Sequence, residues 1–403
     1  MQGMSELISV AEAQRLILER VKPIEAERVP VERAAGRVLA EPAASAVDLP
    51  PFPSSAMDGF ALRSGDTAGA PVALTVVGRI AAGSPALVPL GPGQAMAIST
   101  GGFVPDGADA VVPIELVHED EQGLHVREAV VPGANVRPRG GDAAAGETVL
   151  GAGALLGPAQ VGALAAAGVS EVRCAKRPRV GILVTGSELR PPGAALAPGE
   201  IYESNGLLLA AACQAAGAVP AQLGVVEDDS SQLEREMERA LLGFDMLVTS
   251  GGASVGPHDL VRATFPGFRI EEVFWGVRVK PGKPVCFAMR RDHPIFVLPG
   301  NPVSVLVTFE LFVRPAINAL LGLPDPLPGY ARGVLGAAVT RNPHRDEFVR
   351  ARTRREGDLV ILDPLLGQES HMIVRAARAG ALVAVETGEG ELPAGTEARY
   401  LPL

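Results

Sequence analysis

Three polar turns that are rich in glycine have the composition of a site for an anionic ligand. They are Thr185-Gly-Ser-Glu-Leu189, Ser250-Gly-Gly-Ala-Ser-Val-Gly256 and Leu298-Pro-Gly-Asn-Pro-Val-Ser304. Glycine lets backbone N–H groups approach a phosphate, and nearby helix N-termini add a favourable dipole. Alternatively, the glycines only make tight turns, but three such turns after three predicted strands favour a site. The residues expected to bind the ligand are Ser250, Gly251, Gly252, Ser254, Pro299 and Asn301.

Acidic residues follow the same predicted strands. Glu188 lies in the first turn, Glu227-Asp228-Asp229 follows another strand, and Asp259 comes just after the second turn. Carboxylates without a nearby Cys or His favour a hard cation, most simply Mg²⁺. Asp228 and Asp229 could instead only cap the following helix. We predict that carboxylates of this cluster hold the metal.

A rigid turn supplies two cations. It reads Lys280-Pro-Gly-Lys283-Pro and follows the predicted β-run Glu272–Val279. A lone Lys pair is usually solvated, but here both ammonium groups belong to an otherwise acidic chain, and such groups act as point charges for phosphate. A Walker P-loop is excluded, because Pro257-His258 stands where that motif needs Lys followed by Ser or Thr. We expect Lys280 and Lys283 to contact phosphate.

Composition limits the classes of partner. The 403 residues carry a formal net charge of −10, which disfavours a nucleic-acid or anionic-membrane surface. The three cysteines are far apart and form no CxxC pair, as in reduced cytosolic proteins. The N-terminus lacks the pattern of a signal peptide, and the longest apolar run, Val303–Leu321, carries Glu310 and Arg314. We therefore expect a cytoplasmic protein and no stretch of transmembrane length.

The glycine-rich turns belong to a predicted α/β domain. Strands and helices alternate there, which indicates a doubly wound, mostly parallel sheet whose ligands bind at the carboxyl edge. Pro315 should kink the last helix. The predicted strands are Val180–Thr185, Ala221–Val226, Asp245–Ser250 and Pro294–Leu298, and the helices are Asn205–Ala216, one that begins near Ser231, and Val303–Leu321.

The rest of the chain predicts three more domains. Short apolar runs separated by Gly and Pro indicate a β-rich inserted domain over 45–142. Helices near 9–21 and 158–167 suggest a discontinuous helical linker domain, 1–44 plus 143–173, in which they pack together. The α/β domain covers 174–325. After a Pro-rich linker, 326–403 form a small β-domain with a hairpin at Glu356-Gly357-Asp358.

Together with further motifs, these residues resemble one family over essentially the whole chain. The additional motifs are Pro50-Pro51-Phe52, Ser55-Ala-Met-Asp-Gly-Phe-Ala61, Thr100-Gly101 and Asn135 with Arg137. The chain is similar to the molybdopterin molybdenumtransferases of the MoeA family, whose animal relatives include the E domain of gephyrin.

The resemblance implies a fold, a reaction and a set of site residues. It implies four domains, of which the third resembles the pterin adenylyltransferases and the last is a small β-barrel-like domain. The reaction is the Mg²⁺-dependent insertion of molybdate into adenylylated molybdopterin, with release of AMP. The residues carried over by motif are Asp58, Thr100, Glu188, Asp228, Asp259, Lys280 and Ser370. Among them, the resemblance implies that Glu188 and Asp228 are the ligands of Mg²⁺. Gly276 departs from the pattern, because some members have a second lysine there.

The resemblance also implies partners. A homodimer is expected, in which Asp58 and Thr100 of one subunit complete the site of the other. Other expected partners are a molybdopterin adenylyltransferase and proteins of molybdoenzyme maturation. Two alternatives remain: a non-catalytic scaffold like the gephyrin E domain, and adenylylation of molybdopterin itself. Release of AMP or consumption of ATP would separate the two enzymes.

Overall fold

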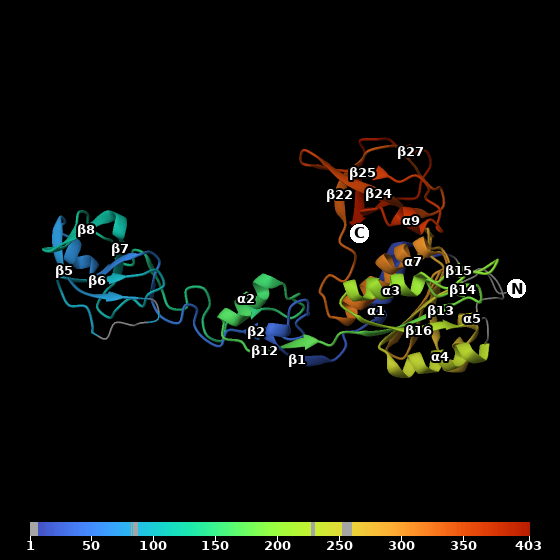
Figure 1. The fold of residues 1–403 in the computed structure, drawn as a ribbon, viewed down its shortest axis with the longest axis horizontal. Helices are drawn as coiled ribbons and strands as arrows, with labels where there is room; N and C mark the ends of the chain where they lie inside the picture. Colours follow the sequence, from blue (N-terminus) through green and yellow to red (C-terminus); the bar gives the residue numbers. More distant parts are fainter. Residues whose placement is uncertain (1–6, 82, 84–87, 227–229, 252–259) are drawn as a thin grey trace. The chain divides into compact units, whose positions relative to one another are not determined.

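The computed structural model describes residues 7–81, 83, 88–226, 230–251 and 260–403. The chain divides into two compact units (Figure 1). Unit 1 consists of Met1–Glu27, Gly36–Ala40 and Arg173–Leu403, and unit 2 consists of Arg28–Ala35 and Glu41–Val172. The boundaries of the four predicted domains stay predictions.

A six-stranded sheet forms the centre of the α/β part of unit 1. Its order is β16-β13-β17-β21-β20-β18. The strands are β13 (Arg179–Thr185), β16 (Val219–Val226), β17 (Met246–Ser250), β18 (Glu271–Trp275), β20 (Cys286–Arg290) and β21 (His293–Leu298). Strands β16, β13, β17 and β21 run parallel, while β20 and β18 continue the sheet antiparallel. The predicted, mostly parallel sheet is confirmed.

Helices cover both faces of this sheet, as a doubly wound fold requires. Alternate residues of β13 face opposite sides: Ile182 belongs to the same hydrophobic core as Leu209 of α3, and Leu183 belongs to the same core as Met237 of α4. Figure 1 shows α3 and α4 on opposite sides of β16. The helices are α1 (Val10–Arg20), α3 (Asn205–Ala215), α4 (Ser230–Gly243), α5 (Leu260–Ala263), α6 (Phe265–Phe268), α7 (Pro302–Thr308) and α8 (Arg314–Leu320).

The first helix packs elsewhere than the sequence suggests. Its N-cap Ser9 accepts a hydrogen bond from the Glu12 N–H at 3.1 Å, as the capping pattern predicts. However, Ala13 and Ile17 are buried in the same core as Ile317 of α8, within unit 1. The helix α2 (Pro158–Ala166) belongs to unit 2. The expectation that helices 9–21 and 158–167 pack together is therefore wrong, because the apolar stripe of α1 is buried in the α/β core.

The long apolar helical run of unit 1 is a core element. A π-helical segment, Phe309–Val313, separates α7 from α8 and directly precedes the turn that contains Pro315. The run Pro302–Leu320 is long and apolar enough to cross a membrane by length and composition alone, contrary to our expectation, but 72% of its most apolar window is buried inside the protein. Glu310 and Arg314 pair with each other at 2.6 Å, so the two charges that interrupt the run are neutralised locally.

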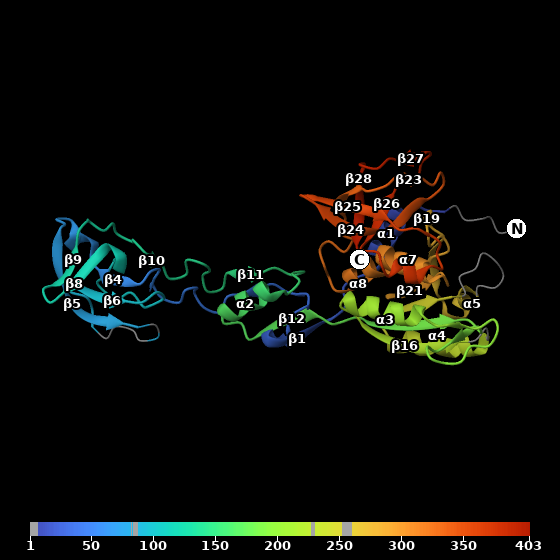
Figure 2. The same ribbon diagram turned by 45° about the horizontal axis from the view of Figure 1, so that its top comes forward.

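The C-terminal part of unit 1 is a small closed barrel (Figure 2). The long β24 pairs with β26 through its first half and with β25 through its second half, and the order β24-β25-β22-β28-β26 closes on itself. The predicted hairpin is confirmed, since Glu356 pairs with Leu359. The strands are β19 (Val279–Lys280), β22 (Ala331–Leu335), β24 (Asp346–Glu356), β25 (Leu359–Pro364), β26 (Ala381–Val385) and β28 (Glu397–Pro402).

Short elements complete unit 1. The helix α9 (Ile373–Ala376) follows the barrel strand β25. Two further sheets have two strands each: β14 (Leu189–Arg190) with β15 (Ile201–Tyr202), and β23 (Val339–Thr340) with β27 (Glu391–Leu392).

Unit 2 is rich in β-structure, as its short apolar runs predict. Its main sheet has the order β7-β4-β6-β5-β9-β8. The strands are β4 (Gly59–Leu62), β5 (Val72–Ile80), β6 (Gln94–Ile98), β7 (Ala110–Pro113), β8 (Val117–Asp120) and β9 (Gly123–Val126). Smaller sheets of unit 2 pair β2 (Ala43–Ala44) with β11 (Thr148–Leu150) and β3 (Ser54–Ser55) with β10 (Val136–Arg137). The strands β1 (Ala26–Pro30) and β12 (Glu171–Ala175) pair with each other, and each has residues in both units.

Candidate functional site

A cavity of about 560 Å³ lies at the carboxyl ends of β13, β17 and β21 in unit 1. Val184 pairs with Ser250, and Ser250 pairs with Leu298, so the three strands end at one edge of the sheet. The residues that follow these strands therefore meet, as expected for an open parallel sheet. The polar lining residues are Thr185, Glu188, Tyr202, Glu203, Ser204, Asn205, Ser250, Asn301 and His371, and Gly186, Gly251 and Gly300 contribute backbone without a side chain.

Of the three glycines that line the cavity, Gly251 has the least room for a side chain. Its φ is +91°, a backbone conformation that L side chains rarely adopt. A Cβ at this position would lie 2.3 Å from the carbonyl oxygen of Thr185. Gly251 thus lies against the end of β13 with no room for a side chain. It is also one of the residues that line the cavity.

A polar network centred on Asn205 connects the second and third turns. The Asn205 amide donates to the Ser250 hydroxyl at 3.0 Å and to the Gly300 carbonyl at 2.7 Å. The Ser250 hydroxyl in turn donates to the Pro299 carbonyl at 3.2 Å. Asn205 begins α3 and was not among the site residues predicted from the sequence. The sequence feature that could have indicated Asn205 is its position as a polar residue at the start of an apolar helix, directly after Glu203-Ser204.

Two buried polar atoms in the lining have no hydrogen-bond partner within the described residues: Thr185 Oγ1 and Asn205 Oδ1. Leaving such atoms unpaired costs free energy, roughly 1–3 kcal/mol each. Both residues line the same cavity. A ligand with a donor for Asn205 Oδ1 and an acceptor for the Thr185 hydroxyl would remove this cost.

Two carboxylates line the cavity in the described part of the chain. Glu188 is exposed, and Glu203 is buried with one oxygen accepting the Gly206 N–H at 2.7 Å. The described residues contain no group of three or more His, Cys, Asp or Glu side chains that could hold a metal ion. Mg²⁺ commonly uses one or two carboxylates together with substrate phosphates and water, so this donor set fits Mg²⁺ in kind.

Four predicted site residues lie outside the described residues. They are Asp228, Gly252, Ser254 and Asp259.

The C-terminal barrel contributes a loop to the cavity. Asn301 donates its side-chain amide to the Ser370 hydroxyl at 2.9 Å, and the Ser370 carbonyl accepts the Val303 N–H at 3.0 Å. The neighbouring His371 lines the cavity. The structure therefore brings Ser370 beside Asn301, although 69 residues separate them in the sequence.

Neither lysine of the rigid turn is among the residues that line the cavity at the sheet edge. Lys280 pairs with Glu347 of β24 at 3.0 Å and lines a second cavity, of about 340 Å³. The predicted continuous β-run Glu272–Val279 is wrong, because the structure interrupts it: β18 ends at Trp275, and the chain turns at Gly276, whose φ is +84°. The chain then joins the barrel through β19, which pairs with β24. Contacts of Lys280 and Lys283 with phosphate stay predictions.

A buried arginine that the sequence analysis missed fixes the loop of Ser370. Arg350 is 1% exposed and donates to the carbonyls of Gly367 at 3.1 Å and Glu369 at 3.2 Å. Gln368 accepts from the Arg350 backbone N–H and guanidinium. Burial lowers the pKa of Arg350. The available signal was an arginine within a strand of Phe, Val and Ala, a position where a charge is costly unless it has partners.

Asp58 and Thr100 form a pair in unit 2. Asp58 accepts hydrogen bonds from the Thr100 N–H at 2.6 Å and from its hydroxyl at 3.1 Å. The register of β4 and β6, with Gly59 opposite Ile98, brings the two residues together. Both are exposed. The sequence correctly placed both in the β-rich region, and the structure shows that they touch.

The fold and the edge cavity define a class. A parallel, doubly wound sheet with a polar, glycine-lined cavity at its carboxyl edge is typical of proteins that bind nucleotide-like ligands. Family models match nearly the whole chain: "MoeA N-terminal region (domain I and II)" over 8–168, "Probable molybdopterin binding domain" over 181–319 and "MoeA C-terminal region (domain IV)" over 332–403.

Individual relatives agree with these models. Molybdopterin molybdenumtransferase 2 of Mycobacterium tuberculosis is 38% identical over 96% of this chain and 98% of its own length. Molybdopterin molybdenumtransferase of Haemophilus influenzae is 32% identical over 96% of this chain and 97% of its own length. The solved structure of a molybdopterin biosynthesis MoeA protein from Pyrococcus horikoshii has a TM-score of 0.83 at 31% identity and covers 98% of this chain and 99% of its own. The chain belongs to the MoeA family of molybdopterin molybdenumtransferases, which are transferases of molybdenum cofactor biosynthesis.

Proposed function

We propose that this protein inserts molybdate into adenylylated molybdopterin in an Mg²⁺-dependent reaction that releases AMP. The observation that carries the proposal is the cavity at the carboxyl edge of the sheet, where Glu188, Gly251 and the unpaired atom of Asn205 meet. A pterin nucleotide offers the phosphate oxygens and N–H groups that this lining can bind. Membership in the family supports the same substrate class.

Each lining group has a physical task in this proposal. The backbone of Gly251 and the Thr185 hydroxyl hold phosphate oxygens in this proposal, because both residues line the cavity and the hydroxyl has no hydrogen-bond partner within the described residues. Asn205 Oδ1 accepts a hydrogen bond from a ring N–H or an amino group of the substrate. Ser250 and Asn301 keep these groups in place through the bonds to Asn205 and Ser370.

Glu188 is the described residue that would hold Mg²⁺, together with Asp228 from the sequence prediction. When bound, Mg²⁺ supplies neutralisation of phosphate charge and polarisation of the bond to the leaving AMP. The protein's own contribution is to present carboxylate oxygens at the cavity mouth beside the phosphate-binding backbone. Lys280 and Lys283 are proposed to attract the anionic substrates, with Lys280 leaving its partner Glu347 to do so.

The activity assay separates three candidate functions. The purified protein is incubated with adenylylated molybdopterin, molybdate and Mg²⁺, and AMP is measured by chromatography. Release of AMP that requires molybdate supports the proposal. Consumption of ATP with unmodified molybdopterin would instead identify an adenylyltransferase, and the absence of both reactions would favour a scaffold like the gephyrin E domain.

We propose further that a homodimer shares each site between its subunits. Asp58 and Thr100 lie in unit 2, whereas Glu188 and the rest of the cavity lie in unit 1. The test mixes Asp58→Ala subunits with Glu188→Ala subunits, each inactive alone, under conditions where subunit exchange is verified by mass. A shared site predicts that heterodimers regain one intact site of two. Mixtures that stay as inactive as the parents would place the site within one chain.

The cellular setting is proposed on the same basis. The protein would act in the cytoplasm and would receive its pterin nucleotide substrate from a molybdopterin adenylyltransferase. Its product would pass to proteins that mature molybdoenzymes.

A further inference from the structure

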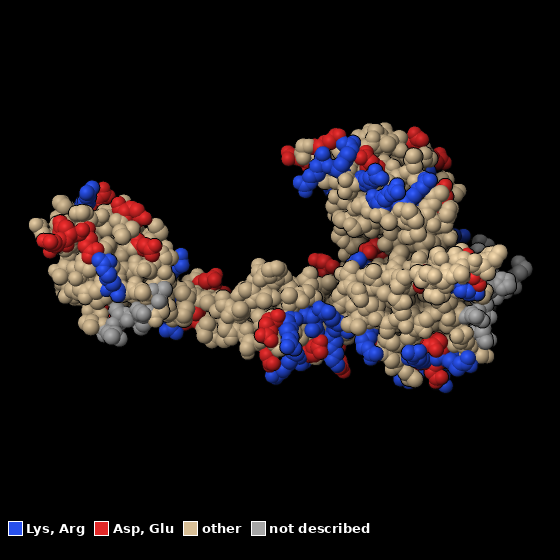
Figure 3. Space-filling view, viewed as in Figure 1, with Lys and Arg blue, Asp and Glu red and all other residues tan. Residues whose placement is uncertain are grey.

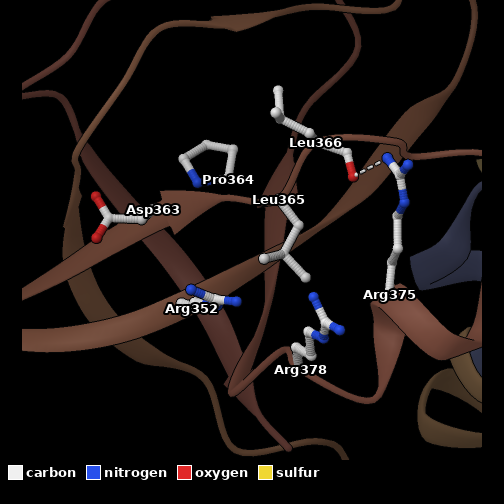
Figure 4. Close-up of a pocket in the computed structure, with 7 residues that line it drawn as sticks. All are labelled: Arg352, Asp363, Pro364, Leu365, Leu366, Arg375 and Arg378. Carbon is white, nitrogen blue, oxygen red and sulfur yellow. Dashed lines mark hydrogen bonds between the residues drawn. The ribbon is translucent and has the colours of Figure 1, made fainter.

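A basic pocket on the C-terminal barrel shares no lining residue with the cavity at the sheet edge and adjoins the cavity of Lys280 at Pro364. Its volume is about 460 Å³. It lies where β24, β25 and the segment around α9 meet (Figure 4). We call it the arginine pocket; its lining residues are Arg352, Asp363, Pro364, Leu365, Leu366, Arg375 and Arg378.

The positive charge of the arginine pocket is not neutralised within the described part of the chain. Arg352 and Arg378 are exposed and have no ion-pair partner among the described residues. The single acidic residue of the lining, Asp363, accepts the Nε–H of Arg354 at 2.6 Å, so its charge is already shared. Figure 4 shows Arg352 and Arg378 on either side of Leu365. Grouped cations repel one another, and this repulsion is relieved when an anion binds.

This pocket stands out against the acidity of the whole protein. The chain carries 46 acidic and 36 basic residues, a formal net charge of −10. On the face shown in Figure 3, basic side chains gather on the part of unit 1 that contains β24 and β25. A local cluster of this kind attracts an acidic partner electrostatically, whereas a surface with net negative charge repels it.

The wall of the arginine pocket is rigid. The Leu366 carbonyl accepts a hydrogen bond from Arg375 at 2.9 Å, and the side chain of Arg375 passes over Gly367, where a Cβ would lie 2.4 Å from its guanidinium. From the inner side, buried Arg350 holds the Gly367 carbonyl, and Gln368 donates to the Leu365 carbonyl at 2.8 Å. A wall fixed from both sides loses little conformational entropy when a partner binds.

Exposed apolar side chains adjoin the arginines. Leu366 is 87% exposed, and Val374 of α9 is 73% exposed. A single exposed leucine is ordinary on a protein surface, but Leu366 lies in a pocket with three arginines, and arginine is enriched where proteins bind each other. A small oxyanion would make no use of these apolar groups. The net charge of −10 disfavours nucleic acid as the occupant.

We propose that the arginine pocket docks an acidic segment of a partner protein in which carboxylates alternate with leucine-like side chains. The carboxylates bind Arg352 and Arg378, while an apolar side chain packs on Leu366. Arg375 mainly orients the wall, because it is bonded to the Leu366 carbonyl.

The test uses the full chain and a defined probe. A fluorescein-labelled twelve-residue peptide of alternating Glu and Leu is titrated with the protein, and binding is followed by fluorescence anisotropy. The variant is the double substitution Arg352→Glu and Arg378→Glu. Its matched control is Arg355→Glu, since Arg355 is an exposed arginine of the same strand, three residues from Arg352, and so on its other face. A second probe carries Gln in place of Glu.

We expect the wild type and Arg355→Glu to bind the Glu peptide alike, and the double variant to bind it at least about tenfold more weakly. Affinity should fall as salt rises, and the Gln peptide should bind as weakly as the double variant binds the Glu peptide. If the double variant has a lowered melting temperature, Arg352→Gln with Arg378→Gln gives the same comparison without new repulsion.

Three results would overturn the proposal. The first is equal affinity of wild type and double variant for the Glu peptide. The second is complete displacement of the peptide by millimolar inorganic phosphate, which would identify a small-anion site. The third is a change in self-association of the double variant by ultracentrifugation, which would show that the occupant is a second copy of this chain.

Discussion

Gly251→Ala tests whether Gly251 lies against the end of β13 with no room for a side chain. The backbone at Gly251 has φ +91°, and the new methyl group would lie 2.3 Å from the Thr185 carbonyl oxygen. Gly193 provides a matched control in the same unit, because its φ is +90° but nothing lies within 4 Å of a Cβ built there. Comparing the two variants separates the cost of the backbone conformation from the cost of the contact.

The expected magnitudes follow from this difference. An alanine forced into the left-handed region costs roughly 1–2 kcal/mol, which is the whole expected effect of Gly193→Ala. Gly251→Ala adds an overpacking cost of about 1–3 kcal/mol, for a total of roughly 2–5 kcal/mol. At about 2–4 °C per kcal/mol for a large domain, its melting temperature should fall clearly further than that of the control.

Differential scanning calorimetry of the wild type and both variants measures these shifts. Urea unfolding followed by circular dichroism provides an independent measure of the same free-energy differences. Equal losses in the two variants would contradict this geometry, because they would show that Gly251 has room for a methyl group beside Thr185. A Gly251→Ala variant as stable as the wild type would refute the backbone argument as well.

Three further predictions follow from individual contacts. Burial opposes ionisation of Asp109, but hydrogen bonds from the Ser64 N–H and hydroxyl outweigh it and hold its pKa below the ordinary 3.8. Because its pKa is lower in the folded state than in the unfolded state, ionised Asp109 stabilises the protein at neutral pH, and this stabilisation is lost as the pH falls through the folded-state pKa. The difference in melting temperature between the wild type and Asp109→Asn should therefore shrink below pH 3.8. Arg350→Met leaves two loop carbonyls without their buried donor and should cost about 2–4 kcal/mol in urea unfolding, whereas an unchanged midpoint would contradict the positioning role. Glu188→Gln should reduce Mg²⁺-dependent AMP release by about 100-fold or more while the melting temperature stays near the wild-type value, because Glu188 is exposed; full activity would remove Glu188 from the metal site.

The α/β core was predictable because its local signals agree with its tertiary structure. The strand that ends at Thr185 is apolar throughout, as a strand buried on both faces must be. The glycine-rich turns follow such strands directly, so the rule for parallel sheets predicts where they meet. Fold class and the main part of the cavity could therefore be derived from sequence.

Packing between distant segments was not predictable in the same way. The periodicity of α1 shows that Ala13 and Ile17 face a core, yet it does not say which core. In the structure the stripe packs against α8, about 300 residues further along the chain. The hydrophobic effect has no direction, so an apolar stripe can be buried against any large apolar surface, and the sequence does not say which one.

Charged residues of the site show the same limit. Lys280 was predicted to contact phosphate, and the sequence did not indicate its ion pair with Glu347, which the pairing of β19 with β24 brings beside it. Asn205 escaped attention because one amide at a helix start carries no pattern, although it bonds to two of the three turns. Sequence thus indicated the type of site, and the remote contacts that complete it required the structure.

The most direct test of the central proposal is a crystal structure of the protein soaked with adenylylated molybdopterin, Mg²⁺ and molybdate. We predict density for the nucleotide in the cavity at the carboxyl edge of the sheet, with its phosphate at Gly251, a metal ion at Glu188 and a polar contact to Asn205 Oδ1. Nucleotide density in the arginine pocket or in the cavity of Lys280, with the edge cavity empty, would contradict the account.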